Sequence, residues 1–116
     1  MLEVAIAVLV FLYLLLLALP GIEWQVAIGA IATLIGLVGG GGAGIVYHLA
    51  LRRTLLRLNQ STRGWLWSPV SRHAAFDDTA QREVLPWFRA GAAGFFVCVA
   101  GIGLVTVAVL RAAFAN

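Results

Sequence analysis

Few side chains in this sequence can do chemistry, and the two histidines come first among them. His48 follows Tyr47 near the end of a long apolar run, whereas His73 lies in a polar stretch. An imidazole can hydrogen-bond, ligate a metal or relay a proton. To ligate a haem, His48 would need a partner histidine, and His73 is the only other histidine in the sequence. We therefore treat Tyr47 and His48 as a candidate cofactor or quinone contact, with simple interfacial hydrogen bonding as the competing interpretation.

The remaining reactive groups point away from catalysis. Asp77 and Asp78 are adjacent, so their side chains diverge and cannot share one substrate atom as an acid–base pair would. Helix capping explains them better, with Asp78 as N-cap and Gln81 closing a capping box. The single cysteine, Cys98, excludes an intramolecular disulfide and a multi-cysteine metal site. We expect no catalytic residue, no metal site and no enzymatic activity, and the sequence indicates no particular cofactor.

A glycine run is the most unusual local feature. Gly39, Gly40, Gly41 and Gly42 are consecutive, and Gly36, Gly40 and Gly44 form two overlapping GxxxG steps. Small residues at this spacing let helix backbones approach closely in lipid. Three interpretations remain open: close helix packing, a hinge or unwound point lining a cavity, and a groove for a lipid tail, pigment or quinone. The predicted helix-packing residues are Gly36, Gly39, Gly40, Gly44, Gly94 and Gly101.

The composition requires an apolar solvent around the elements that carry these residues. Of 116 residues, 62% are hydrophobic and 11% are charged. A soluble chain of this length could not bury so much apolar side chain. Three uncharged runs reach the roughly 20 residues that cross a bilayer: 4–22, 26–51 and 90–110. The sequence predicts an all-α integral membrane protein with three transmembrane helices in a single membrane domain.

The element boundaries follow from breakers and periodicity. Helix one is expected over 2–19, and Pro20-Gly21 ends it in a tight hairpin with helix two. Helix two is expected over 24–59. Its apolar part alone measures about 39 Å at 1.5 Å per residue, so we expect a cytoplasmic extension. Leu51, Leu55 and Leu58 give that extension an apolar face.

The rest of the chain is predicted as a long loop and a third span. Residues 60–88 carry Gly, Ser and Pro and then a short amphipathic helix that opens at Asp77-Asp78. Trp65 and Trp67 are expected at the headgroup level. Helix three is expected over 89–112.

The arginines set the expected orientation. All eight basic residues except Arg111 lie between Arg52 and Arg89. Basic residues mark the cytoplasmic side of a membrane protein, which places the N-terminus inside and the C-terminus outside a bacterial inner membrane. Arg111 does not fit this pattern, because it would lie near the outer face of the membrane. Arg52, Arg53 and Arg57, with the two tryptophans, are predicted to meet anionic lipid headgroups or to dock a partner. No nucleic-acid partner is expected.

These patterns give three functional hypotheses. The first is a non-catalytic accessory or anchor subunit of a larger inner-membrane complex, such as a respiratory or photosynthetic one, with other integral membrane subunits as partners. The second is a small homo-oligomeric channel or carrier lined by the glycine run. The third, the weakest, is a cofactor- or quinone-contacting subunit that uses His48.

Overall fold

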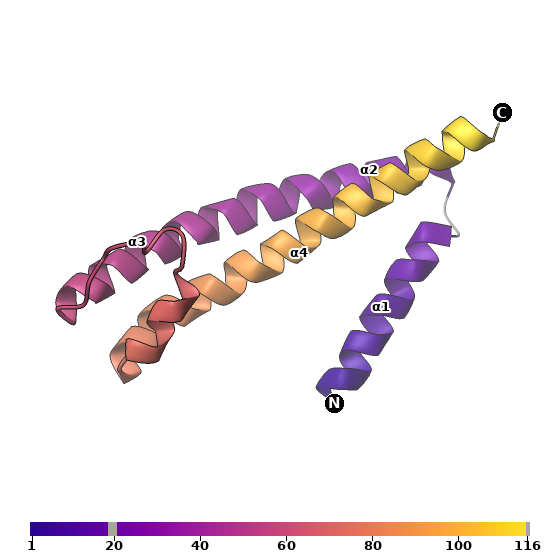
Figure 1. Cartoon of the computed structure of the whole chain (residues 1–116). Coiled ribbons are helices and arrows are strands. Elements are labelled where there is room, and N and C mark those ends of the chain that lie inside the picture. Colours follow the sequence, from indigo (N-terminus) through magenta and orange to yellow (C-terminus); the bar gives the residue numbers. More distant parts are fainter. Residues whose placement is uncertain (19–20, 116) are drawn as a thin grey trace. The chain divides into compact units, whose positions relative to one another are not determined.

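The computed structural model describes residues 1–18 and 21–115, which are helical with no strand among them (Figure 1). Contacts divide the chain into two compact units. The central unit comprises residues 35–96, and the terminal unit lies within residues 1–34 and 97–116. The helices are α1 (Leu2–Ala18), α2 (Ile22–Ile35), the π-helical η1 (Gly36–Gly40), α3 (Gly41–Arg57), the 3₁₀-helical η2 (Val70–Ala75) and α4 (Asp78–Phe114).

Two helical stretches are long and apolar enough to cross a membrane, judged by length and composition alone: Ile22–Arg57 and Asp78–Phe114. Helix α1 is equally apolar but has only 17 described residues. It ends at Ala18, and the predicted last residue, Leu19, lies outside the described residues. The all-helical prediction is therefore confirmed, and two of the three expected spans have the required length.

The long second helix differs from its prediction at both ends and in the middle. It begins at Ile22 rather than at residue 24 and ends at Arg57 rather than at residue 59. In Figure 1 the helical ribbon continues without a break from α2 through η1 into α3. The glycine run neither unwinds nor breaks the helix. It widens one turn, because π-helical hydrogen bonds span five residues instead of four.

A left-handed residue ends α3. Asn59 has a φ of 53°, a conformation that asparagine and glycine tolerate best. The Gln60 N–H donates to the carbonyl of Leu55 over 2.9 Å, and the Asn59 N–H donates to that of Leu56 over 3.2 Å. These two bonds form a Schellman motif, which satisfies helix-end carbonyls and reverses the chain. The reversal fixes the helix end two residues before the predicted one.

Helix α4 is one uninterrupted helix of 37 residues. The predicted short helix and the predicted helix three are therefore continuous, and no loop separates them. The N-cap is also shifted by one residue: Asp77, not Asp78, accepts a 2.8 Å hydrogen bond from the Ala80 N–H. Ala80 occupies the third helical position, so the expected capping box with Gln81 does not form. Pro86 lies inside the helix, where it removes one backbone donor and crowds the carbonyl four residues earlier.

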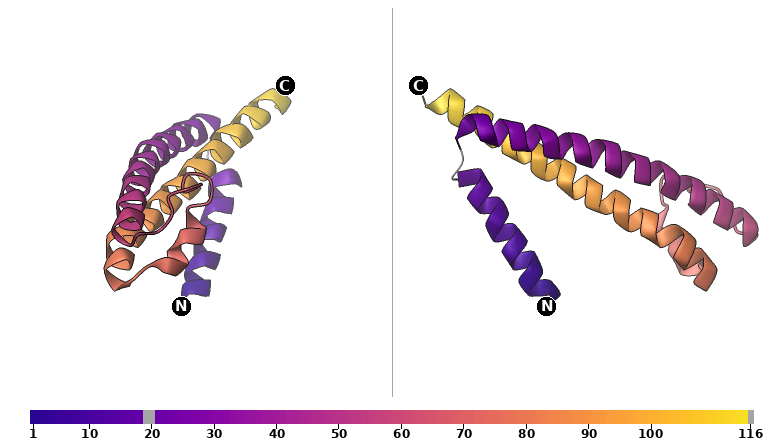
Figure 2. Two further views of the ribbon diagram at one scale, coloured as in Figure 1. Left: turned by 60° about the vertical axis from the view of Figure 1, so that its left-hand side comes forward. Right: turned by 180° about the vertical axis from the view of Figure 1, so that it is seen from behind.

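The core of the central unit is built where α3, η2 and α4 meet. Helix α3 and the first half of α4 run side by side in Figures 1 and 2, and the connecting segment lies against α4. Leu51, Leu55, Ala80 and Val84 are completely buried there. Tyr47 and Phe76 complete the cluster, and Trp65 and Phe88 pack against it. The leucine face predicted for the extension of helix two is thus covered by protein.

Candidate functional site

Tyr47 and His73 are joined by a hydrogen bond that the sequence did not predict. The Tyr47 hydroxyl and His73 Nε2 are 2.8 Å apart. The rings of Phe76 and Phe88 lie 5.0 and 5.1 Å from the His73 imidazole, centroid to centroid. Burial among these groups lowers the pKa of His73 below its ordinary value, because desolvation disfavours the imidazolium. His73 is therefore a half-buried residue at the edge of the core, which the sequence placed only in a polar stretch.

His48 has a separate environment. Its Nδ1 lies 2.9 Å from the carbonyl oxygen of Gly44, one turn earlier in α3. Its ring centroid is 5.7 Å from that of Trp65. Trp65 also packs against the core, whereas Trp67 is 90% exposed. Because His73 bonds to Tyr47, the two histidines do not form the paired axial ligands that a six-coordinate haem needs.

A shallow apolar groove runs beside His48. It has a volume of about 390 Å³ and is lined by Gly41, Gly44, Ile45, His48, Leu49 and Leu66. Two mixed grooves lie on other parts of the central unit. One, of about 570 Å³, holds Arg53, Arg82, Glu83 and Trp87 beside apolar residues of α3.

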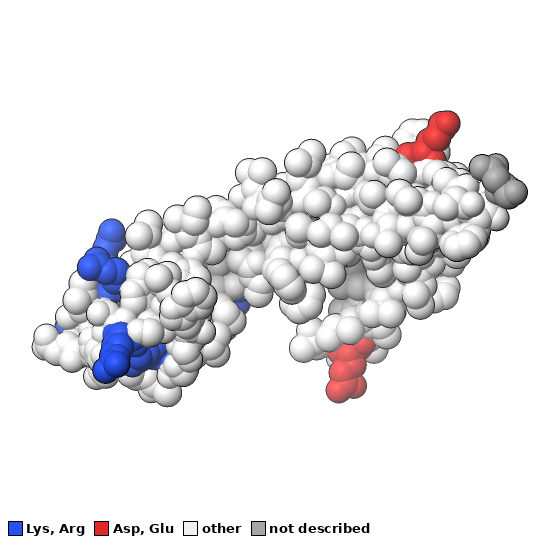
Figure 3. Space-filling view, turned by 45° about the horizontal axis from the view of Figure 1, so that its top comes forward, with Lys and Arg blue, Asp and Glu red and all other residues white. Residues whose placement is uncertain are grey.

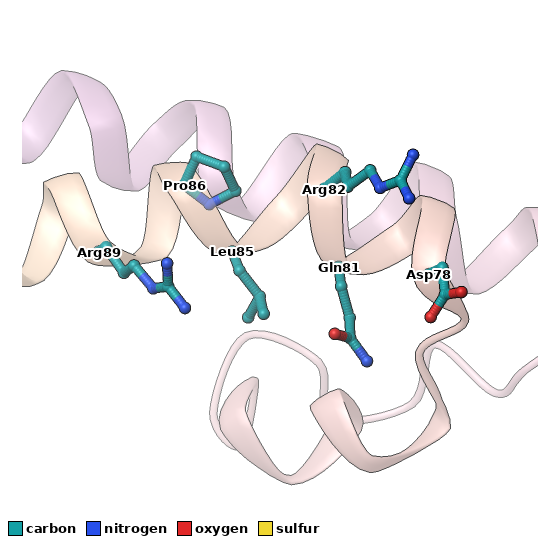
Figure 4. A pocket seen from close by; sticks show the side chains of 6 residues that line it. All are labelled: Asp78, Gln81, Arg82, Leu85, Pro86 and Arg89. Carbon is teal, nitrogen blue, oxygen red and sulfur yellow. The ribbon is translucent and has the colours of Figure 1, made fainter.

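The third groove, of about 540 Å³, lies along the start of α4 (Figure 4). Gln81, Leu85 and Arg89 extend from the helix toward the connecting segment, whereas Arg82 and Pro86 lie on its other side. Asp78 is the single carboxylate that lines it. This groove therefore offers no pair of acid and base groups.

The predicted interfacial arginines divide into two kinds. Basic side chains gather over the end of α3 and the start of α4 on the face shown in Figure 3. Arg52 and Arg53 are exposed. Arg57 instead forms an ion pair with Asp77 at 3.2 Å, with both side chains nearly half exposed. An exposed pair of this kind adds little stability, so its structural role is to join the end of α3 to the cap of α4.

The glycines predicted to pack lie in different surroundings. A Cβ added at Gly40 would lie 2.8 Å from the Cα of Gly94, and one at Gly94 would strike the Gly40 backbone and approach the Gly36 carbonyl oxygen at 3.1 Å. Gly36 and Gly40 are buried. A Cβ at Gly39 or Gly44 would meet no atom within 4 Å. Gly44 nevertheless lies close to α4, since a Cβ at Gly91 would be 3.5 Å from its backbone nitrogen.

The terminal unit has its own close contact at Gly101. A Cβ there would lie 2.6 Å from the carbonyl oxygen of Gly29 and 2.5 Å from Oγ1 of Thr33. Gly29 was not among the predicted packing residues, since it stands alone without a GxxxG partner. Gly103 leaves room for the Tyr13 hydroxyl, which donates a 2.8 Å hydrogen bond to the Ala100 carbonyl.

Gln25 is the residue that the sequence analysis missed. It is completely buried. Its Nε2 donates to the carbonyl oxygens of Leu16 and Leu17, at 3.0 and 2.7 Å, and its Oε1 accepts from Arg111 at 3.0 Å. The amide thus satisfies carbonyls that have no partner within the last turn of α1. It also gives Arg111 a structural role, which explains a basic residue outside the main arginine cluster.

Among the described residues, no group of three or more His, Cys, Asp or Glu side chains is placed to hold a metal ion. Cys98 is a half-buried free thiol. Comparison of the sequence and structure with protein-family models, curated proteins and solved structures finds no match.

Proposed function

We propose that this chain is a non-catalytic accessory or anchor subunit that packs against other integral membrane polypeptides in a bacterial inner membrane. The observation that carries the proposal is the bare glycine surface of η1 and α3. Cβ atoms at Gly39, Gly41 and Gly42 would meet nothing within 4 Å. Each glycine weakens a helix by roughly 1 kcal/mol relative to alanine. A helix from another chain that approaches this surface closely would offset that cost.

Helix α1 supports the same proposal. None of its residues is buried, and large apolar side chains such as Leu9 and Phe11 are 66% and 61% exposed. At about 1.5 Å per residue the helix measures roughly 26 Å, close to the hydrocarbon thickness. We therefore retain α1 as a third span, with lipid and a partner helix covering its surface.

The sequence of the spans favours a structural role over transport of protons or ions. Residues 26–51 and 90–110 contain no Asp, Glu, Lys or Arg. Ionisable groups inside a span are costly and are tolerated chiefly where they serve function. Arg52 and Arg53 lie beyond this region, and in this proposal they bind anionic headgroups, at about 1 kcal/mol per residue near the surface.

The decisive experiment is purification of the tagged chain from its native membrane in a mild detergent. Recovery of other membrane polypeptides in fixed proportion supports the proposal. Recovery of copies of this chain alone contradicts it and favours the homo-oligomeric channel or carrier. Gly39→Leu should reduce partner recovery because its side chain holds a neighbouring helix away, whereas Gly39→Ala should retain it. Equal recovery with both variants would mean that the glycine surface faces lipid.

The proposed orientation has its own test. On a Cys98→Ser background, a cysteine at Gly21 should react with an impermeant maleimide applied from outside the cell. A cysteine at Ser71 should react only after the membrane is permeabilised, because the arginine-rich segment is cytoplasmic in this proposal. The reverse labelling pattern would invert the topology.

A further inference from the structure

The hydrogen bond of His48 fixes which ring nitrogen is available. The Gly44 carbonyl oxygen can only accept, so the Nδ1 atom 2.9 Å away must carry the proton. In the neutral imidazole this leaves the lone pair on Nε2. A metal-ligating histidine typically has this arrangement, in which one nitrogen donates to a backbone carbonyl and the other binds the metal. Within the described part of the chain, no protein group bonds to Nε2.

The surface beside this imidazole is flat and apolar. Gly41 and Gly44 precede His48 by seven and four residues, so they lie on the same face of α3. Neither glycine has an atom within 4 Å of its Cβ position. Ile45, Leu49 and Leu66 complete the groove of about 390 Å³, which lies within the range of ligand sites. The missing side chains of Gly41 and Gly44 leave room for a planar apolar ring above this face of α3.

A positive charge lies one turn beyond the imidazole. Arg52 follows His48 by four residues, which places it on the same helix face, and it is exposed. A guanidinium binds carboxylates with paired hydrogen bonds. Along this face of α3, Gly41 and Gly44 come first, the imidazole of His48 follows, and the guanidinium of Arg52 comes last.

We propose that this groove binds a metal tetrapyrrole that carries carboxylate side chains, a haem, with His48 Nε2 as its single axial protein ligand. The ring covers Gly41 and Gly44, and Arg52 pairs with a ring carboxylate. His73 does not supply a second ligand, because its Nε2 is hydrogen-bonded to the Tyr47 hydroxyl. Gly41 belongs both to this site and to the glycine surface proposed above for a partner helix, but the two proposals have separate readouts, hemin binding here and partner recovery there.

The test is a titration of the purified full-length protein in detergent with hemin, followed by the Soret absorbance. We expect saturable binding of one equivalent with the spectrum of a histidine-ligated iron. His48→Ala should weaken binding by more than the roughly tenfold that losing an outer-sphere partner costs. Arg52→Gln should weaken binding by a smaller factor, and His73→Gln should preserve the histidine-ligated spectrum.

Two glycine variants separate the groove from the fold. Gly44→Leu fills the groove yet meets no atom within 4 Å at its Cβ, so it should abolish binding while the helical circular dichroism is unchanged. Gly42→Leu is equally unobstructed but does not line the groove, so it should bind hemin normally. Absence of saturable binding, or binding of unchanged affinity in either His48→Ala or Gly44→Leu, would overturn the proposal.

Discussion

At the scale of single residues, identical glycines have opposite roles. Gly40 lies against the backbone of Gly94, while Gly39, Gly41 and Gly42 meet no neighbouring atom at their Cβ positions. The sequence indicated that some of these glycines permit close packing. It could not indicate which ones, because the π-helical turn changes the direction in which each residue of the run faces.

The contrast predicts opposite stability effects from the same substitution. Gly40→Ala should destabilise the protein by about 1–3 kcal/mol, because the added methyl group meets the Gly94 backbone. Gly42→Ala should stabilise α3 by up to roughly 1 kcal/mol, because alanine favours helix and nothing obstructs it. Thermal unfolding in detergent, followed by circular dichroism, measures both. Equal melting temperatures would contradict the Gly40–Gly94 contact.

The half-buried His73 predicts a dependence of stability on pH. Burial lowers its pKa in the folded protein, so the unfolded chain binds the proton more readily. The stability that the neutral imidazole contributes is complete above the unfolded pKa, near 6.5, and is lost as the pH falls through the lower folded value. The NMR titration of the His73 ring should show a midpoint below that of the same histidine in urea. A midpoint at or above the urea value would contradict the burial of this ring.

At the scale of elements, the ends of the helices depend on single side chains. Asp77 caps α4 through Ala80 and pairs with Arg57, and Asn59 ends α3 in a left-handed conformation. Hydropathy located both ends of the second helix and the C-terminal end of α4 to within two residues, but it placed the start of the last helix at residue 89 instead of Asp78. It could not show that the amphipathic segment continues into the last helix, because proline usually interrupts a helix. Pro86 is nevertheless the ninth residue of α4.

The cap predicts an order among three variants. Asp77→Ala should lower the melting temperature most, because it removes both the cap and the ion pair. Asp77→Asn should lower it less, since asparagine still caps. Asp78→Ala should have the smallest effect. A larger drop in melting temperature for Asp78→Ala than for Asp77→Ala would indicate that Asp78 is the N-cap.

The same carboxylate adds a pH effect on the acid side. The hydrogen bond from Arg57, and then that from the Ala80 N–H, hold the pKa of Asp77 below its usual value. Its contribution is therefore complete above the unfolded pKa and is lost as the pH falls through the folded one. The melting temperatures of the wild type and of Asp77→Asn should converge in strong acid.

At the scale of the whole molecule, the chain consists of a contiguous central unit and a terminal unit assembled from distant segments. Composition and run lengths were sufficient to predict an all-helical chain with long apolar helices. Tyr13, Gln25 and Gly29 contact distant segments of the terminal unit, and no local pattern in the sequence indicates these contacts. Gln25 in particular is a polar residue that precedes an apolar run, yet in the structure it is completely buried and makes three side-chain hydrogen bonds.

The hydrogen bonds of Gln25 predict that this residue stabilises the terminal unit. Gln25→Leu should destabilise it by about 1–3 kcal/mol, because the Leu16 and Leu17 carbonyls lose their side-chain donor. Limited proteolysis near residue 21 should accelerate in this variant. Thr106→Val is the matched control, since its exposed hydroxyl bonds only within its own helix. Equal cleavage rates in the two variants would show that Gln25 does not hold α1.

The hydrogen bonds that close the terminal unit join residues made at very different times. Tyr13 and Ala100 are 87 positions apart, and Gln25 and Arg111 are 86 apart. A ribosome adding 5–20 residues per second needs about 4–17 s to cover that distance. The central unit is contiguous, so its chain is available sooner. During biogenesis α1 and α2 must therefore wait in the nascent protein, with Tyr13 and the Gln25 oxygen still lacking these partners, until the last helix emerges.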